Sequence, residues 1–104
     1  MKTKVTALHC QVGDELRTRA EAVAERFEHL SPHALDASVV FDQEAEGPTA
    51  EIRLHVRGGQ ILVAHGTGVD HRTALDRAEE KLRKQLERAI TQSRRARREA
   101  GDLS

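Results

Sequence analysis

A row of cations near the end of the chain is the sequence feature best suited to chemistry. Arg77, Lys81, Lys84 and Arg88 recur every three or four residues and therefore share one side of a helix. We call these four residues the basic row. Successive members lie about 5 to 6 Å apart, close to the spacing of phosphates along a nucleic-acid backbone. The row predicts a phosphate-binding surface, and a solvated helix face is the alternative.

The acidic residues of the same segment are sorted onto a different side. Glu80 with Lys84, and Glu79 with Arg83, have the i,i+4 spacing of ordinary surface pairs, which favours the solvated face. Like charges at 77/81 and 84/88, however, cost a few tenths of a kcal/mol each in an isolated helix. A helix that served stability alone has no reason to keep them, and this favours binding.

The remaining reactive residue types do not form a convincing site. The chain has six histidines, but only His55 and His65 lie in a well-defined hairpin, where we expect them on opposite faces. Cys10 is expected to be a small, partly buried thiol. Gly66-Thr67-Gly68 lacks the lysine of a phosphate-binding loop and is interpreted as a connector. We therefore expect no metal, no cofactor and no enzymatic activity.

Length and composition limit the kind of fold that can carry the basic row. The 104 residues are 38% hydrophobic with two phenylalanines, which suits one domain with a small aliphatic core. The net charge is zero, but residues 1–52 carry −5 and residues 53–104 carry +5. A single cysteine, and the lack of a signal peptide or a membrane-spanning segment in the sequence, predict a soluble cytoplasmic protein.

The first half of the sequence predicts a strand, a helix and a second strand. Residues 5–12 alternate loosely as a strand, and Gly13 ends it. Residues 14–30 show apolar residues at helical spacing, stopped by Ser31-Pro32. Residues 37–41 alternate again, and residues 43–48 form an acidic turn.

The second half predicts a hairpin and a long helix. Residues 50–56 alternate cleanly, and Gly58-Gly59 suits a two-residue turn, so pairing Arg57 with Gln60 would bury Ile61, Val63 and His65. Asp70 is a plausible N-cap for a helix from His71 to at least Ile90. The order β-α-β-β-β-α predicts an α+β fold, a four-stranded sheet with both helices on one face.

Three segments of the chain resemble a known family. They are Leu16-Arg17, the hairpin Leu54-His55-Val56-x-Gly58-Gly59-x-Ile61, and Ala74-Leu75-Asp76 followed by Lys81-Leu82-x-Lys84-Gln85-Leu86-x-Arg88. In this order they are similar to the short ribosome hibernation promoting factors and ribosome-associated inhibitors, also called sigma-54 modulation proteins. The resemblance covers about residues 4–90. It implies a domain like the double-stranded-RNA-binding fold.

The resemblance also implies a partner and a set of contacts. Such a protein occupies the mRNA and tRNA channel of the small ribosomal subunit under stress and blocks translation. Its partners are then 16S rRNA and ribosomal proteins, with no membrane and no small-molecule substrate, and off the ribosome we expect a monomer. The RNA-binding residues that follow from the resemblance and the basic row are Arg17, Arg26, Arg77, Lys81, Lys84, Gln85 and Arg88.

Two further expectations complete this interpretation. Residues 1–92 are taken as the ribosome-binding domain and residues 93–104, with the run Arg94 to Arg98, as a basic C-terminal tail without fixed structure. The chain ends without the extra C-terminal domain of long family members, and we interpret it as a short form. The alternative function is a charge-separated adaptor that binds a protein and not RNA.

Overall fold

The computed structural model describes residues 2–31 and 33–102, with the backbone alone described at residues 2, 90 and 92–102. Six elements follow one another along the chain: β1 (Lys2–Ala7), α1 (Asp14–Leu30), β2 (Ala34–Glu44), β3 (Gly47–Val56), β4 (Gln60–Thr67) and α2 (His71–Asp102). This is the predicted β-α-β-β-β-α order, and the fold class is confirmed.

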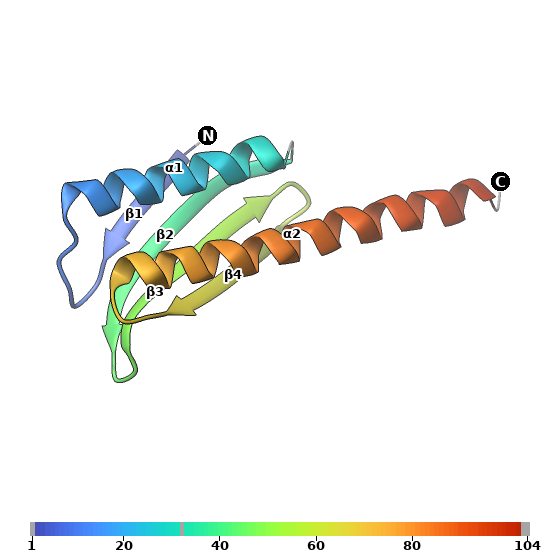
Figure 1. Ribbon diagram of the computed structural model, residues 1–104. Coiled ribbons are helices and arrows are strands. Elements are labelled where there is room, and N and C mark those ends of the chain that lie inside the picture. The colour runs from blue at the N-terminus through green and yellow to red at the C-terminus, as the bar shows by residue number, and fades with distance from the viewer. Residues whose placement is uncertain (1, 32, 103–104) are drawn as a thin grey trace.

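The four strands form one sheet in the order β1-β2-β3-β4. β1 runs parallel to β2, because the α1 crossover returns the chain to the same end, and the other neighbours are antiparallel. Both helices cover the same face of the sheet, with α1 over β1 and β2 and α2 over β3 and β4 (Figure 1). Among the described residues, no helix lies on the opposite face of the sheet.

The core lies between the sheet and the two helices. Its largest fully buried side chains include Phe27 from α1, Phe41 from β2, Ile52 and Leu54 from β3, and Leu82 from α2. These residues come from the apolar positions that recur every three or four residues in the helices and every two in the strands. The core is small, as predicted, and aliphatic except for Phe27 and Phe41.

Helix α1 begins and ends where the sequence predicts. Asp14 and Glu15 occupy its first turn, where negative charge interacts favourably with the helix dipole. Ser31 leaves the helical conformation at the other end, and its amide donates to the carbonyl of Phe27 at 3.1 Å. The residue before a proline is driven out of the helical region, which explains the boundary.

Strand β1 lies nearer the N-terminus than the alternating pattern predicts. β1 covers Lys2–Ala7 and not residues 5–12, and the chain bends at residues 8–10. His9 has a φ of 56°, a left-handed conformation that a strand cannot contain. The turn between β2 and β3 is also shorter than predicted, because the ladder extends to the pair Glu44 and Gly47 and leaves two residues between the strands.

The predicted register of the β3–β4 hairpin is wrong by one residue. Val56 pairs with Gln60, so the loop holds three residues, Arg57-Gly58-Gly59, and both glycines have positive φ. A shift of one residue turns every side chain to the other face. Ile61 and Val63 are therefore 48% and 39% exposed, and His65 is exposed as well. Leu62, Ala64 and Gly66 face the helices instead, because they lie opposite buried residues of β3.

This register explains how closely α2 approaches the sheet. A Cβ added at Gly66 would overlap the carbonyl oxygen of Ala74 and lie 2.7 Å from the amide nitrogen of Ala78. Only glycine at this position allows the backbones of β4 and α2 to meet. Asp70 caps the helix as predicted, since its carboxylate accepts a 2.7 Å hydrogen bond from the amide of Thr73.

Helix α2 is longer than the predicted minimum. It runs for 32 residues and projects beyond the sheet (Figure 1). The backbone of residues 93–102 continues the helix, but the side chains of the predicted basic tail, Arg94 to Arg98, lie outside the described residues. Within the described chain, no helix is both long enough and apolar enough to cross a membrane.

Candidate nucleic-acid interface

Three α2 side chains bind the carbonyl oxygens of strand β4. Nη1 of Arg77 donates to the carbonyl of Thr67 at 2.8 Å, and Nζ of Lys81 donates to the carbonyl of His65 at 2.9 Å. Nε2 of Gln85 donates to the carbonyl of Val63 at 2.9 Å. We call these three hydrogen bonds the carbonyl ladder. β4 is an edge strand, so these carbonyls have no neighbouring strand to pair with.

The ladder works because a helix and a strand repeat at nearly the same distance. Four residues of α-helix rise about 6 Å, and two residues of strand advance about 6.7 Å. Residues 77, 81 and 85 therefore stay in step with residues 67, 65 and 63 as the two elements run in opposite directions. The basic row is partly a structural device that covers an open edge.

The ladder fixes two cations without neutralising them. A backbone carbonyl carries no net charge, so Arg77 and Lys81 keep their full positive charge while losing conformational freedom. Arg77 uses one of its five N–H donors in the ladder and Lys81 one of its three. Both residues remain exposed, and their remaining donors are available to an anion.

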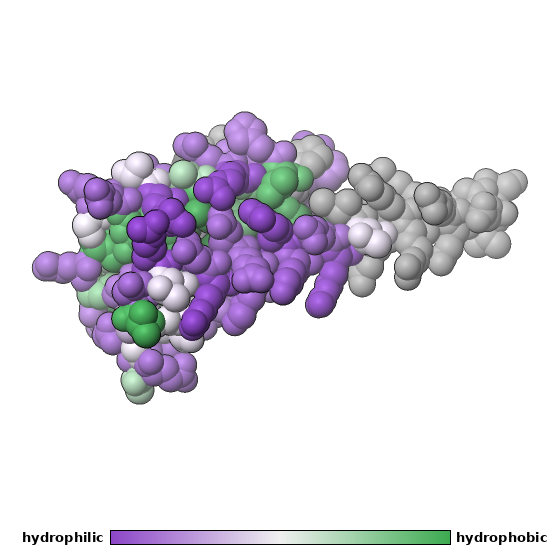
Figure 2. All heavy atoms as spheres, viewed as in Figure 1, coloured by the Kyte–Doolittle hydropathy of each residue, from purple (hydrophilic) through white to green (hydrophobic). Residues whose placement is uncertain are grey.

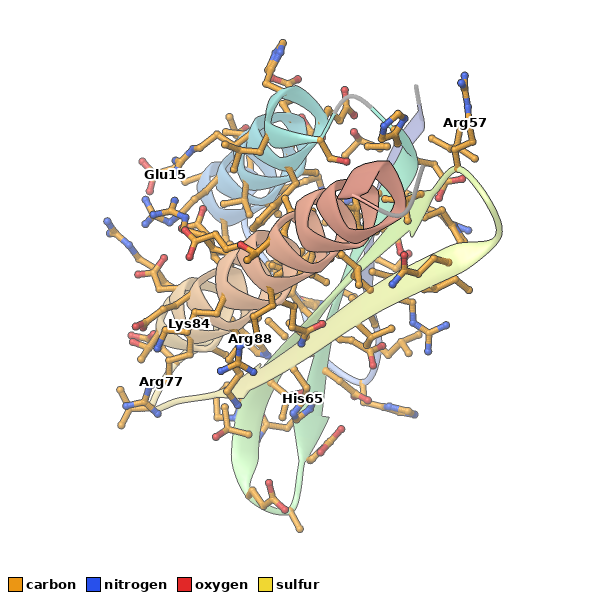
Figure 3. The ribbon with its side chains drawn as sticks, turned by 90° about the vertical axis from the view of Figure 1, so that its right-hand side faces the viewer. Glu15, Arg57, His65, Arg77, Lys84 and Arg88 are labelled. Atoms are coloured by element: carbon orange, nitrogen blue, oxygen red, sulfur yellow. The ribbon has the colours of Figure 1, made fainter. Side chains whose placement is uncertain are left out.

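The other half of the basic row takes no part in the ladder. Lys84 forms an i,i+4 ion pair with Glu80 at 3.5 Å, with side chains that are 64% and 70% exposed, and such pairs are weak. Arg88 is exposed. Figure 3 shows Arg77, Lys84 and Arg88 on the side of α2 that faces away from α1. The row is therefore an exposed cationic surface along one flank of the molecule.

Ion pairs between the helices account for the placement of two acids on α2. Arg19 contacts Asp76 at 2.8 Å, and Arg26 contacts Glu79 at 3.1 Å. The hydrogen bond to Asp76 raises the pKa of the Arg19 guanidinium. These acids face α1, so they are directed away from the basic row. Asp76 and Glu79 thus have a structural reason to lie toward α1, whereas Glu80 pairs with Lys84 of the basic row.

The structure separates the predicted RNA-binding residues into three groups. The flank along α2 brings together Arg77, Lys81, Lys84, Gln85 and Arg88. Arg26 lies at the seam between the helices, paired with Glu79. Arg17 donates to the carbonyl of Val5 at 3.2 Å, beside β1 at the opposite edge of the sheet. Contacts from all seven residues to one RNA segment would need RNA on more than one side.

Sequence reasoning missed the partners of the ladder. The residues that accept these hydrogen bonds are backbone carbonyls, whose position depends on the β4 register and not on residue type. Gln85 was named only from the family resemblance. Its position four residues after Lys81 is the one signal that could have placed it in the same row.

Three histidines pair with carboxylates of β2. His55 contacts Asp36, His9 contacts Asp42 at 3.0 Å, and His65 lies 3.8 Å from Glu44. The hydrogen bond from His9 lowers the pKa of Asp42. His55 and His65 share the open face of the sheet, which corrects the expectation that they lie on opposite faces. The described residues contain no group of three metal-ligating side chains.

The family resemblance is tested by comparison with known proteins. The model of the family described as "Sigma 54 modulation protein / S30EA ribosomal protein" matches residues 3–94. The chain belongs to this family. Within the S30EA family, a curated protein from Rhizobium meliloti named ribosome hibernation promotion factor is 26% identical over 89 residues. That match covers 85% of this chain and 47% of the relative, so the chain spans about half of its length.

Solved structures share the fold of this S30EA-family chain. A ribosomal subunit interface protein from Coxiella burnetii has a TM-score of 0.77 at 16% identity, covering 88% of this chain and 99% of that one. The N-terminal domain of Protein Y from Thermus thermophilus has a TM-score of 0.69 at 25% identity, covering 82% and 93%. The predicted family and fold are both confirmed.

Proposed function

We propose that this protein is a ribosome-associated hibernation factor that binds the small ribosomal subunit in the cytoplasm under stress. In this proposal it contacts 16S rRNA in the mRNA and tRNA channel and blocks translation by occupying that space, without catalysis. Family membership supports ribosome association, and the names of similar proteins point to hibernation and to a subunit interface.

The observation that carries the proposal is the state of the basic row. Two of its cations are held in place by neutral carbonyls, and all four remain exposed. Ordering side chains before binding reduces the entropy that binding would otherwise cost. The row therefore offers phosphates four positive charges about one helical turn apart, two of which are held in place before binding.

Cosedimentation with purified 30S subunits tests the proposal. Displacement of counterions from RNA makes affinity fall with salt, by about 0.7 to 0.9 logarithmic units per phosphate contacted. With four to six contacts, the slope of log affinity against log salt should be about −3 to −5. Absence of the protein from the 30S fraction at low salt would contradict the proposal.

A matched pair of variants localises the contact. Lys84→Glu with Arg88→Glu reverses two charges in the row that the carbonyl ladder does not use, so the fold should persist while 30S binding is lost. Arg53→Glu with Arg57→Glu makes the same change in net charge on exposed positions elsewhere, and Figure 3 places Arg57 away from the row. Equal loss in both variants would remove the row from the proposal.

The alternative function, a protein-binding adaptor, makes a different prediction in a pull-down. An adaptor would keep its partner after nuclease treatment, whereas an RNA-bound factor would lose rRNA-dependent association. Survival of the complex after complete RNA digestion would therefore favour the adaptor.

A further inference from the structure

The outer side of α1 carries carboxylates that the fold does not use in ion pairs. Glu21 and Glu25 are exposed, and no ion pair to them is found among the described residues. At about 100° per residue, Glu21, Glu25 and Glu28 share one side of the helix. We call these three residues the acidic row. Glu21 and Glu25 are like charges at i,i+4, a spacing that opposes helix formation.

Contacts made by neighbouring residues fix which way this row points. Arg19 and Arg26 of α1 reach toward α2, where they pair with acids. Glu28 accepts a 3.0 Å hydrogen bond from Thr3 of β1, on the other side of the helix. The acidic row therefore lies on the β1 flank of the molecule, and the basic row lies on the β4 flank.

The two rows have matching spacing. The acidic row has steps of four and three residues, and Arg77, Lys81 and Lys84 of the basic row have the same steps in the same order. Figure 1 shows that α1 and α2 run in the same direction across the sheet. A second copy placed beside the first in the same orientation would therefore bring Glu21, Glu25 and Glu28 opposite Arg77, Lys81 and Lys84.

Nothing in the overall charge opposes such an approach, because the net charge of the chain is zero. We propose that copies of this protein associate head to tail, the acidic row of one copy against the basic row of the next. The contact is heterologous and leaves one row free at each end, so it produces short chains of copies and not a closed dimer.

The structure favours a second copy as the partner, because the chain itself supplies the complementary row. Exposed ion pairs are individually weak and are screened by salt. We therefore expect the association to be weak and to occur only at low ionic strength. This proposal changes the expectation of a monomer off the ribosome. If the proposed function holds, RNA and a second copy compete for the same cations.

Sedimentation velocity of the purified chain, without RNA, tests the association directly. At low salt the weight-average mass should rise above 11.6 kDa as protein concentration increases. At about 0.5 M salt, where the Debye length falls well below the 10 Å of 0.1 M salt, it should return to the monomer mass. A monomer mass at every concentration in low salt would overturn the proposal.

A pair of variants with equal change in net charge separates this contact from general attraction. Glu21→Gln with Glu25→Gln removes two charges of the acidic row, and Glu44→Gln with Glu46→Gln removes two charges from the β2–β3 hairpin. Only the first pair should abolish the rise in mass. Equal behaviour of the two variants would overturn the proposal. Binding to 30S subunits should survive in the first variant, so this test is independent of the proposed function.

Zero-length crosslinking identifies the residues in contact. A carbodiimide joins a carboxylate to a lysine only when the two touch, and the acidic and basic rows lie on opposite flanks of one molecule. A crosslink from Glu21 or Glu25 to Lys81 or Lys84 therefore has to join two copies. Such peptides should appear in the dimer band at low salt. Dimer bands linked only through other residues would contradict the proposed contact.

Discussion

At the scale of single residues, the four cations of the basic row have different roles. Arg77 and Lys81 cover the edge of β4, whereas Lys84 and Arg88 make no contact that the fold needs among those described. A substitution at Arg77 or Lys81 would disturb the strand edge and the binding surface together. Lys84 and Arg88 are therefore the residues that report on binding alone.

We expect Lys84→Gln to lower the salt dependence of RNA binding by one phosphate contact. The slope of log affinity against log salt should become shallower by about 0.7 to 0.9 units, because one fewer counterion is released. Titration of the variant with rRNA at several salt concentrations measures this slope. An unchanged slope would show that Lys84 contacts no phosphate, and Arg57→Gln serves as the control of equal charge.

Asp70 gives a prediction about acid. Its hydrogen bonds to Thr73 lower the pKa of its carboxyl below the ordinary 3.8. A carboxyl with a lowered pKa in the folded state stabilises the fold above its ordinary pKa, and this contribution is lost as the pH falls through the lowered value.

The corresponding experiment compares thermal unfolding of the native chain and Asp70→Ala. At pH 7 the variant should melt at a lower temperature, since the amide of Thr73 loses its cap. The difference between the two proteins should shrink below about pH 4. A difference that stays constant down to pH 2 would show that the charge of Asp70 does not contribute.

At the scale of elements, the contact between β4 and α2 depends on one glycine. We expect Gly66→Ala to destabilise the fold by about 1 to 3 kcal/mol, because the added methyl overlaps the α2 backbone at Ala74. Gly13→Ala is the matched control, since a Cβ there meets nothing within 4 Å. Urea unfolding measures both changes. Similar stability in the two variants would mean that α2 can move away without cost.

The helix ends could be predicted from the sequence, but the register behind the β4–α2 contact could not. The helices were predicted well because their signals are local: the acidic first turn and Ser31 for α1, and Asp70 for α2. The register of β4 was not, because two adjacent glycines suit both a two-residue and a three-residue loop. The tight packing of α2 over Gly66 requires the register of the longer loop. This packing is a tertiary contact, so the local sequence pattern does not reveal it.

In the candidate site, too, local features were predictable and tertiary placement was not. Arg77, Lys81, Lys84 and Arg88 were predicted to share one side of a helix, and the helix places them there. Arg17 and Arg26 were grouped with them from the resemblance, and tertiary structure places these two residues at an opposite edge and at an interhelical seam. Local periodicity predicts which residues share a face of one element, but it does not predict how two elements are placed.

At the scale of the whole molecule, charge is arranged by flank and face. Figure 2 shows a largely hydrophilic surface over the helices, interrupted by small hydrophobic patches. A groove of about 490 Å³ between the helices is lined by Leu30 and Leu86, with charged residues around them. The balance of charges makes the net charge zero near neutral pH.

We expect the solubility of the protein to be lowest near pH 7.0 at low salt, because the net charge is zero at that pH. Added salt should raise the solubility by screening attraction between oppositely charged flanks. Turbidity across a grid of pH and salt measures both effects. Solubility that falls as moderate salt is added would indicate hydrophobic association instead.

The carbonyl ladder has a consequence for how the protein behaves when crowded. An uncovered strand at the border of a sheet is a template to which another polypeptide can add in extended form, the first step toward amyloid-like growth. Arg77, Lys81 and Gln85 occupy backbone carbonyl oxygens of β4 with which an added strand would have to pair. The carbonyl ladder therefore opposes the addition of a strand to β4, even where zero net charge removes the electrostatic repulsion between copies.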